Sequence, residues 1–296
     1  MGNKISIITP TYNSAETIER CINSVLMQNH PHFEHIVVDG LSSDGTQKIL
    51  DKYSHITYIS EKDKGIADAL NKGFKLCTGN IIGILNSDDY YNSEAFNAII
   101  PYFKNDIKFV VGKIKVVRAD GSFFINDPKT LFDDMIYHWQ NKAFPVNPVG
   151  YFYSRDIHEI VGGYNPLNKY AMDLEFLLKA SLQTNFIKID SSLPELGVFH
   201  LHKGSITARA FTNPFFFNKK NFFFVNNLYQ NLNAKAKRDF PKLRRIGYLK
   251  RNIIIINRNI CESKGLQKCI HYIYLFYAKS LLNICLIFSI RNSPSK

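Results

Sequence analysis

Short apolar runs alternate with helical segments through residues 5–91, and this alternation restricts the fold more than any other feature. The runs are Ile5–Ile8, Phe33–Val38, Ile56–Ile59 and Ile81–Leu85. Runs of this length, rich in Ile and Val, predict buried strands. Because strands that alternate with helices form βαβ units, we expect an α/β fold with a largely parallel sheet and helices on its faces.

The fourth run ends abruptly in the polar cluster Asn86, Ser87, Asp88 and Asp89. Open α/β sheets bind ligands just beyond the carboxyl ends of their strands. Two adjacent carboxylates in such a crevice need compensation, which a divalent cation that bridges to phosphate would supply. The alternative is that an aspartate caps a helix near residues 93–103. These residues alone leave both interpretations open.

Positive charge is concentrated in the last third of the chain. Residues 201–296 hold 18 Lys and Arg against 2 Asp and Glu, which is +16, so the total of +12 leaves −4 for residues 1–200. We therefore predict a globular domain at 1–205 and a basic, aromatic-rich helical extension at 206–296. Its segment Ile270–Ile290 is long enough to span a bilayer, but Lys279 and other polar residues favour a helix lying on an anionic membrane surface.

The five cysteines are scattered and lack metal-ligand spacing, which fits a reducing compartment. The first strand follows the start of the sequence at once, so no signal peptide is expected. We predict a cytoplasmic protein, peripheral on the inner face of the cell membrane.

Four segments resemble, in order and spacing, the inverting family 2 glycosyltransferases. They are Ile8–Asn13 (ITPTYN), Val37–Thr46 (VVDGLSSDGT), Glu61–Gly73 (EKDKGIADALNKG) and Leu85–Asp89 (LNSDD). The resemblance covers residues 4–204 and implies a GT-A fold, a Rossmann-like mixed sheet flanked by helices. It also implies a UDP-linked sugar donor, Mn²⁺ or Mg²⁺, and a saccharide or lipid-linked acceptor in O-antigen, capsule or lipopolysaccharide synthesis.

The resemblance also assigns residues to the donor site. The expected donor-binding residues are Thr9, Pro10, Tyr12, Glu16, Asp39, Lys64, Asp68, Asn71, Asn86 and Asp88. The expected cation ligands are Asp89, Asp88 and His200, with His202 nearby; Asp89 is expected on the cation and Asp88 towards the ribose. Simpler roles stay open for some of them: Glu16 fits a capping box, and Asp68 with Lys72 forms an i,i+4 pair.

An inverting transfer needs one general base, because the acceptor hydroxyl loses its proton as it attacks. Asp173, at the start of a helix over 172–182, matches the position of the family's base. Glu175 is the alternative, but Lys179 at i+4 makes it look like half of a surface ion pair. We predict that Asp173 is catalytic.

Two other classes of function compete with this interpretation. A basic, aromatic segment is also typical of nucleic-acid binding, but the positive charge is confined to the extension, and an acidic crevice would repel a polyanion. The chain could also bind a sugar nucleotide without catalysis. Because no GxGxxG or P-loop pattern occurs at a strand-to-helix turn, dinucleotide and P-loop sites are disfavoured.

Overall fold

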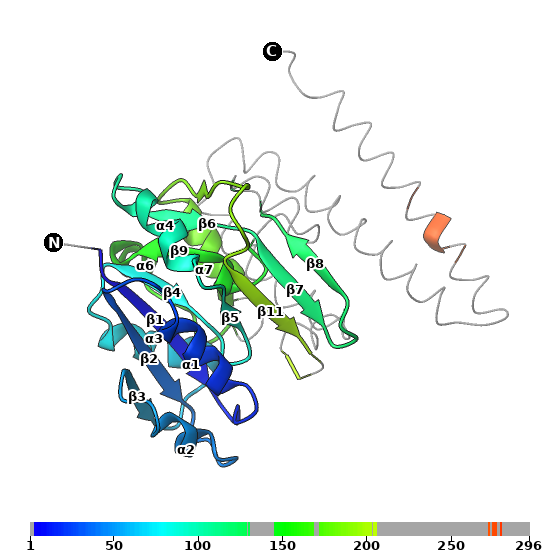
Figure 1. Cartoon of the computed structure of the whole chain (residues 1–296). Coiled ribbons are helices and arrows are strands. Elements are labelled where there is room, and N and C mark those ends of the chain that lie inside the picture. The colour runs from blue at the N-terminus through cyan, green and yellow to red at the C-terminus, as the bar shows by residue number, and fades with distance from the viewer. Residues whose placement is uncertain are drawn as a thin grey trace, which may run out of the picture. The chain divides into compact units, whose positions relative to one another are not determined.

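The computed structural model describes residues 3–128, 130, 145–168, 172–202, 204–205, 272, 274–276 and 279. The chain divides into two compact units, Met1–Met135 with Lys142–Asn213 and Ile136–Asn141 with Pro214–Lys296. Every helix and strand labelled in Figure 1 lies in the first unit.

A mixed seven-stranded sheet lies at the centre of the first unit, in the order β10-β6-β9-β4-β1-β2-β3 (Figure 1). Its strands are β1 Ile5–Thr11, β2 Phe33–Asp39, β3 Ile56–Ser60, β4 Ile81–Ile84, β6 Phe109–Val111, β9 Tyr151–Ser154 and β10 Ile187–Lys188. The four strands predicted from the apolar runs are parallel, and β9 runs antiparallel between β4 and β6. The predicted α/β fold is confirmed.

Helices pack on both faces of this sheet. They are α1 Ile18–Leu26, α2 Thr46–Leu50, α3 Ile66–Leu76, α4 Ala95–Phe103, α6 Arg155–Val161 and α7 Met172–Ser181. Neighbouring residues of β1 show the two sides: the Thr9 hydroxyl lies 3.8 Å from Cys21 Sγ of α1, whereas Ile8 faces α3. A Cβ at Gly73 of α3 would lie 2.4 Å from Ile8 Cγ2, so a glycine permits this close approach.

Strand β1 continues beyond the apolar run Ile5–Ile8 that predicted it, through Pro10 to Thr11. Pro10 pairs with Val38 of β2, and Thr11 pairs with Asp39. On the other side β4 pairs with β1 only as far as Ile8. Alternate residues of a strand direct their backbone N–H and C=O groups to the same side, so Pro10, like Ile8, faces the side of β4. The pairing with β4 has already ended there. The missing N–H of Pro10 therefore costs no hydrogen bond between strands.

A second, four-stranded sheet has the order β5-β11-β7-β8. Its strands are β5 Tyr90–Tyr91, β7 Ile114–Arg118, β8 Phe123–Asn126 and β11 Gly197–Leu201. A hairpin turn at Asp120–Gly121 joins β7 to β8, and Gly121 has φ +81°. The apolar segment before this hairpin is divided at Gly112 between the two sheets, with β6 on one side and β7 on the other. A Cβ at Gly112 would lie 2.7 Å from Leu196 Cδ1, so the chain turns where only glycine fits.

Most of the helical extension predicted at 206–296 lies outside the described residues. The boundary predicted after residue 205 also stays a prediction. Within the predicted amphipathic segment Ile270–Ile290, Tyr272, Tyr274–Phe276 and Lys279 are helical, with Leu275 buried and the other four exposed. Among the described residues, no helix combines the length and the hydropathy needed to cross a bilayer.

Candidate active site

The loops that follow β1, β2 and β3 meet at one edge of the large sheet. A Cβ at Gly40, after β2, would lie 2.8 Å from Asp63 Oδ2 and 3.4 Å from Tyr12 Cδ2. The Tyr12 ring is 64% exposed and stands open beside this junction. The three loops therefore converge, as their places after neighbouring parallel strands predict.

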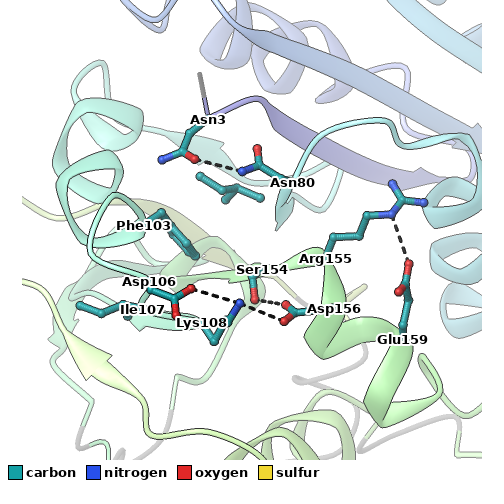
Figure 2. A pocket seen from close by; sticks show the side chains of 11 residues that line it. Asn3, Asn80, Phe103, Asp106, Ile107, Lys108, Ser154, Arg155, Asp156 and Glu159 are labelled. Carbon is teal, nitrogen blue, oxygen red and sulfur yellow. Dashed lines mark hydrogen bonds and ion pairs between the residues drawn. The ribbon is translucent and has the colours of Figure 1, made fainter. Parts of the chain in front are cut away.

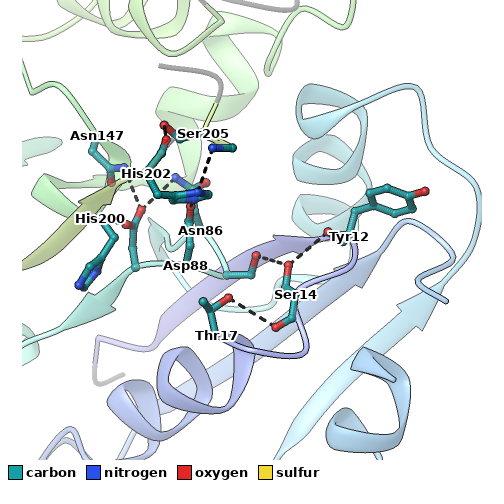
Figure 3. Close-up of polar contacts among 12 residues, drawn as sticks. Tyr12, Ser14, Thr17, Asn86, Asp88, Asn147, His200, His202 and Ser205 are labelled. Carbon is teal, nitrogen blue, oxygen red and sulfur yellow. Dashed lines mark hydrogen bonds and ion pairs between the residues drawn. The ribbon is translucent and has the colours of Figure 1, made fainter. Parts of the chain in front are cut away.

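The loop after β4 joins the same edge. The Ser14 hydroxyl lies 2.8 Å from the Ser87 hydroxyl (Figure 3). Asn13 has φ +50°, and its side-chain oxygen accepts from the Ser43 N–H at 2.9 Å. Asn13 thus ties two loops together, ahead of α1, which begins at Ile18.

Asp88 and His202 point towards each other in Figure 3. Asp88 Oδ2 and His202 Nε2 are 2.8 Å apart, and both side chains retain access to solvent. Strand β11 pairs antiparallel with β5, with Val198 opposite Tyr90, so the chain just beyond β11 returns to the chain just before β5. This pairing brings two residues that are 114 positions apart to one point.

Asp89 is oriented differently from Asp88. Its side chain is fully buried, and its carboxylate accepts three hydrogen bonds: from the His200 N–H at 2.9 Å, Asn147 Nδ2 at 2.8 Å and Asn86 Nδ2 at 3.2 Å. Burial raises the pKa of Asp89, and the neighbouring Asp88 raises it further, while the three donors oppose the rise. The expected cation ligand Asp89 is therefore bonded inward, to β11 and to the loop that contains Asn147.

His200 also lies apart from the Asp88 carboxylate. Its Nδ1 is 3.3 Å from the Arg20 guanidinium, and its ring centroid is 5.5 Å from that of Tyr90. Arg20 also donates to the Asp88 carbonyl oxygen at 2.8 Å. Burial, followed by the charge of Arg20, lowers the pKa of His200. His202, which was expected only near the cation ligands, rather than the expected ligand His200, faces the Asp88 carboxylate.

The donor set at Asp88 fits a divalent cation that is completed by other ligands. No three His, Cys, Asp or Glu side chains within the described part of the chain form a metal-binding group. One carboxylate and one imidazole, both partly exposed, nevertheless converge. Mg²⁺ is commonly held by one or two protein carboxylates together with water and substrate phosphates, and imidazole is a ligand that Mn²⁺ accepts.

Several expected donor-binding residues make structural contacts instead of facing the site. Thr9 is buried, with its hydroxyl 2.8 Å from His35 Nε2, and Pro10 lies within β1. Asp68 accepts from the Lys64 N–H at 3.0 Å and lies 3.7 Å from Lys72, as the alternative role predicted. Glu16 is exposed in the turn before α1.

Asn71 and Asp39 are both bonded within the protein. Asn71 holds the backbone of Tyr164 at both groups, donating to its carbonyl at 2.7 Å and accepting from its N–H at 2.9 Å. Asp39 is fully buried and accepts from the Ser60 hydroxyl at 2.6 Å, from Gln47 Nε2 at 3.1 Å, and from the N–H and hydroxyl of Ser42. Asp39 thus fixes the loop after β2 from inside, beside Gly40.

Asp173 and Glu175, the two candidate bases, have opposite surroundings on α7. Asp173 Oδ1 is buried and has no hydrogen-bond partner among the described residues. Burial raises the pKa of Asp173 to about 6. Glu175 is buried rather than on the surface, and it is fully engaged, with Lys179 Nζ at 2.9 Å, Asn168 Nδ2 at 2.8 Å and Asn165 Nδ2 at 3.2 Å. Of the two candidates, Asp173 has the available oxygen and the raised pKa of a general base.

No sequence pattern pointed to Asn147 or to the part played by Arg20. Asn147 follows a loop-rich stretch, 58 residues from its partner Asp89, so its contact depends on the tertiary fold. Arg20 lies on α1, where an arginine is ordinarily a solvated surface residue. Its contacts with Asp88 and His200, which are 68 and 180 positions away, exist only in the folded chain.

A separate cavity of about 350 Å³ lies at the opposite end of the strands (Figure 2). Asn3 and Asn80, which line it, precede β1 and β4, whereas the site described above follows those strands. Its charged residues pair with one another: Lys108 with Asp106 and Asp156, and Arg155 with Glu159. We assign no function to this cavity.

Known proteins are similar to parts of this chain in sequence. A teichuronic acid biosynthesis glycosyltransferase of Bacillus subtilis, TuaG, described as putative, is 34% identical over 143 residues, 45% of this chain and 56% of that protein. The Escherichia coli glucosyltransferase WfgD is 37% identical over 118 residues, 38% of this chain and 47% of that protein. The chain thus spans about half the length of these two relatives.

Solved structures share the fold at lower sequence identity. Residues 1–349 of Staphylococcus aureus TarS, in complex with UDP-GlcNAc, superimpose with a TM-score of 0.59 and 19% identity over 86% of this chain and 80% of that chain. The Pyrobaculum calidifontis mannosyltransferase PcManGT superimposes with a TM-score of 0.52 and 17% sequence identity, over 100% of this chain and 77% of that chain. Residues 6–160 match the family described as glycosyl transferase family 2, which is more than half of the sequence. The chain therefore belongs to glycosyl transferase family 2.

Proposed function

We propose that the protein is a metal-dependent inverting glycosyltransferase. It moves a sugar from a nucleotide-diphosphate donor to a saccharide acceptor of a bacterial surface polysaccharide. The observation that carries this proposal is the presence of two sets of functional groups. At the sheet edge, the side chains of Asp88 and His202 converge. On α7, the buried Asp173 Oδ1 has no hydrogen-bond partner in the described part of the chain.

The donor and acceptor follow from the relatives. TarS is described in complex with UDP-GlcNAc, and PcManGT with GDP-Man and Mn²⁺. WfgD is named as transferring glucose from UDP-Glc to a GlcNAc-diphosphoundecaprenol. We infer a UDP-sugar donor, Mn²⁺ or Mg²⁺ as cofactor, and a lipid-linked or otherwise membrane-presented saccharide acceptor. The enzyme would act at the cytoplasmic face of the cell membrane, with the basic extension on the anionic lipid.

The chemistry assigns one step to each group. The oxygen of the acceptor hydroxyl bonds to the anomeric carbon, on the face opposite the leaving group. Asp173 takes the proton of this hydroxyl as the bond forms. The bond from the anomeric carbon to the diphosphate oxygen breaks, its electron pair stays with the nucleoside diphosphate, and the sugar configuration inverts. A divalent cation held by Asp88 and His202 would neutralise charge on that diphosphate.

We propose that Asp89 acts by position rather than by cation binding. Its bonds to the His200 N–H and to Asn147 hold β11 against the loop after β4. His202 stays opposite Asp88 only while this junction is intact. The sequence-based expectation placed Asp89 on the cation and Asp88 towards the ribose, and the inward orientation of the Asp89 oxygens favours the reverse.

UDP titration in the presence and absence of Mn²⁺ tests this assignment. Asp88→Asn and His202→Asn should lose the Mn²⁺-dependent part of the UDP affinity while their melting temperatures stay near that of the wild type. A thermal-shift screen of nucleotide sugars with Mn²⁺ would identify the donor, because a ligand at about 100 times its Kd stabilises by about 2.7 kcal/mol. Unchanged Mn²⁺-dependent affinity in Asp88→Asn would contradict the proposed cation site.

A further inference from the structure

The second sheet packs one face against the core, and its opposite face, which is covered at Val198 of β11, is exposed at β8. Ile114, Val116 and Phe199 belong to the hydrophobic core. Side chains alternate along strands, and paired positions share a face. The register pairs Lys115 with Ile125 and Val117 with Phe123, which puts these four residues together on the opposite side. We call these four residues the outer face of the hairpin.

Apolar residues occupy this face where polar ones are expected. Antiparallel strands with one solvated side usually alternate apolar and polar residues. On β8, which is the edge strand of this sheet, Phe123 is 58% exposed and Ile125 is 40% exposed. They alternate with Phe124, which is partly buried and packs against the core. Burial of Phe124 accounts for one side of β8, and nothing in the described core requires Phe123 or Ile125.

Cations accompany the aromatic rings of this hairpin. On the outer face, Lys115 Nζ lies 4.2 Å from the Phe123 ring centroid; on the core side, Arg118 Cζ lies 4.9 Å from that of Phe124. The acid of the hairpin, Asp120, lies in the turn and accepts from the N–H and hydroxyl of Ser122. Exposed aromatic and aliphatic side chains beside a Lys, as on the outer face, are a combination that binds the interface of an anionic bilayer.

We propose that the outer face of the β7–β8 hairpin is a membrane-docking surface for anionic phospholipid headgroups. Charge favours this occupant over the chain's own extension: residues 201–296 carry +16, so they do not complement a face whose charged side chain is Lys115. The hairpin pairs with β11 through Val117 and His200, close to His202 and the candidate cation site. Docking there would hold a lipid-linked acceptor within reach of the site.

This inference rests on the proposed function only for the membrane location of the acceptor. Its test measures lipid binding without catalysis, so that either can fail alone. The full-length chain is co-sedimented with vesicles of phosphatidylcholine, with and without phosphatidylglycerol. Phe123→Ser/Ile125→Ser should lower partitioning onto the phosphatidylglycerol vesicles by about tenfold or more. Lys115→Gln should lower it by about fivefold on those vesicles and leave phosphatidylcholine binding unchanged.

A position-specific readout separates the hairpin from the basic extension, which can bind lipid by itself. The fluorescence of Phe123→Trp in a Trp139→Phe background should be quenched by brominated phosphatidylglycerol. That of the matched control Ile160→Trp should not be, because Ile160 is 60% exposed on α6, away from this sheet. Circular dichroism and UDP affinity verify the fold of each variant.

Three outcomes would overturn the proposal. One is the absence of quenching in the Phe123→Trp variant while the protein is bound to vesicles. The second is wild-type partitioning of the Phe123→Ser/Ile125→Ser variant. The third is loss of a dimer in this double variant with lipid binding intact, which would assign the face to a second copy of the chain.

Discussion

Replacing Asp173 by asparagine should abolish turnover and stabilise the fold at the same time. The carboxylate has a buried oxygen without a partner among the described residues, and burial raises its pKa from an ordinary value of 3.8 to about 6. An amide of the same shape carries no charge into that site. A group that is optimal for catalysis at the expense of the fold is expected to behave in this way.

The magnitude follows from the displaced pKa of Asp173. Each pKa unit corresponds to about 1.4 kcal/mol, so the displacement is worth at most about 3 kcal/mol against the folded state above about pH 6. The folded protein holds this proton more tightly than the unfolded chain. The cost is therefore absent below about pH 4 and grows as the pH rises towards 6. For a domain of this size, about 3 kcal/mol corresponds to roughly 6–12 °C in melting temperature.

Thermal unfolding of wild type and Asp173→Asn between about pH 4 and pH 8 measures this effect. The difference in melting temperature should be near zero at the acid end and should reach its full value above about pH 6. Glu175→Gln is the matched control on the same helix. Glu175 pairs with Lys179 and two asparagines, so its loss should destabilise by about 3 kcal/mol. A destabilised Asp173→Asn variant, or one with wild-type turnover, would refute the reasoning.

Further predictions concern the pH profile, the loop anchors, the core and the cofactor. Because Asp173 must be ionised to accept a proton, kcat/KM should rise with pH and level off above about pH 6, as initial rates with saturating Mn²⁺ can show. Asn71→Ala removes both bonds to the Tyr164 backbone and should cost about 2–3 kcal/mol in urea unfolding. In Gly83→Ala the new methyl would lie 2.6 Å from Phe152 Cε1, so the same assay should give a loss of about 1–3 kcal/mol. EDTA should abolish transfer, and added Mn²⁺ or Mg²⁺ should restore it; full activity in EDTA would remove the cofactor from the mechanism.

The sequence predicts the order of strands and helices because the signal for each is local. Runs such as Ile81–Leu85 and the helical pattern of 66–76 specify an element through their own periodicity. Parallel strands then place the loops after them at one edge, which is why the meeting of the Tyr12, Gly40 and Asp63 loops could be expected without coordinates. Boundaries were less well predicted: whether Pro10 ends β1 depends on where its neighbour β4 stops.

The division of roles within the site was decided by tertiary structure alone. Asp88 and Asp89 are adjacent and chemically identical in the sequence, yet one faces the exposed His202 and the other is bonded inside the protein to Asn147 and the His200 backbone. Adjacent side chains point in different directions, and their partners come from segments that are distant in the sequence. The sequence by itself therefore determines that an acidic, ligand-binding edge exists. Only the packing of β11 and the Asn147 loop against that edge determines which carboxylate faces His202 and which is buried, because burial and hydrogen bonding are properties of the folded chain.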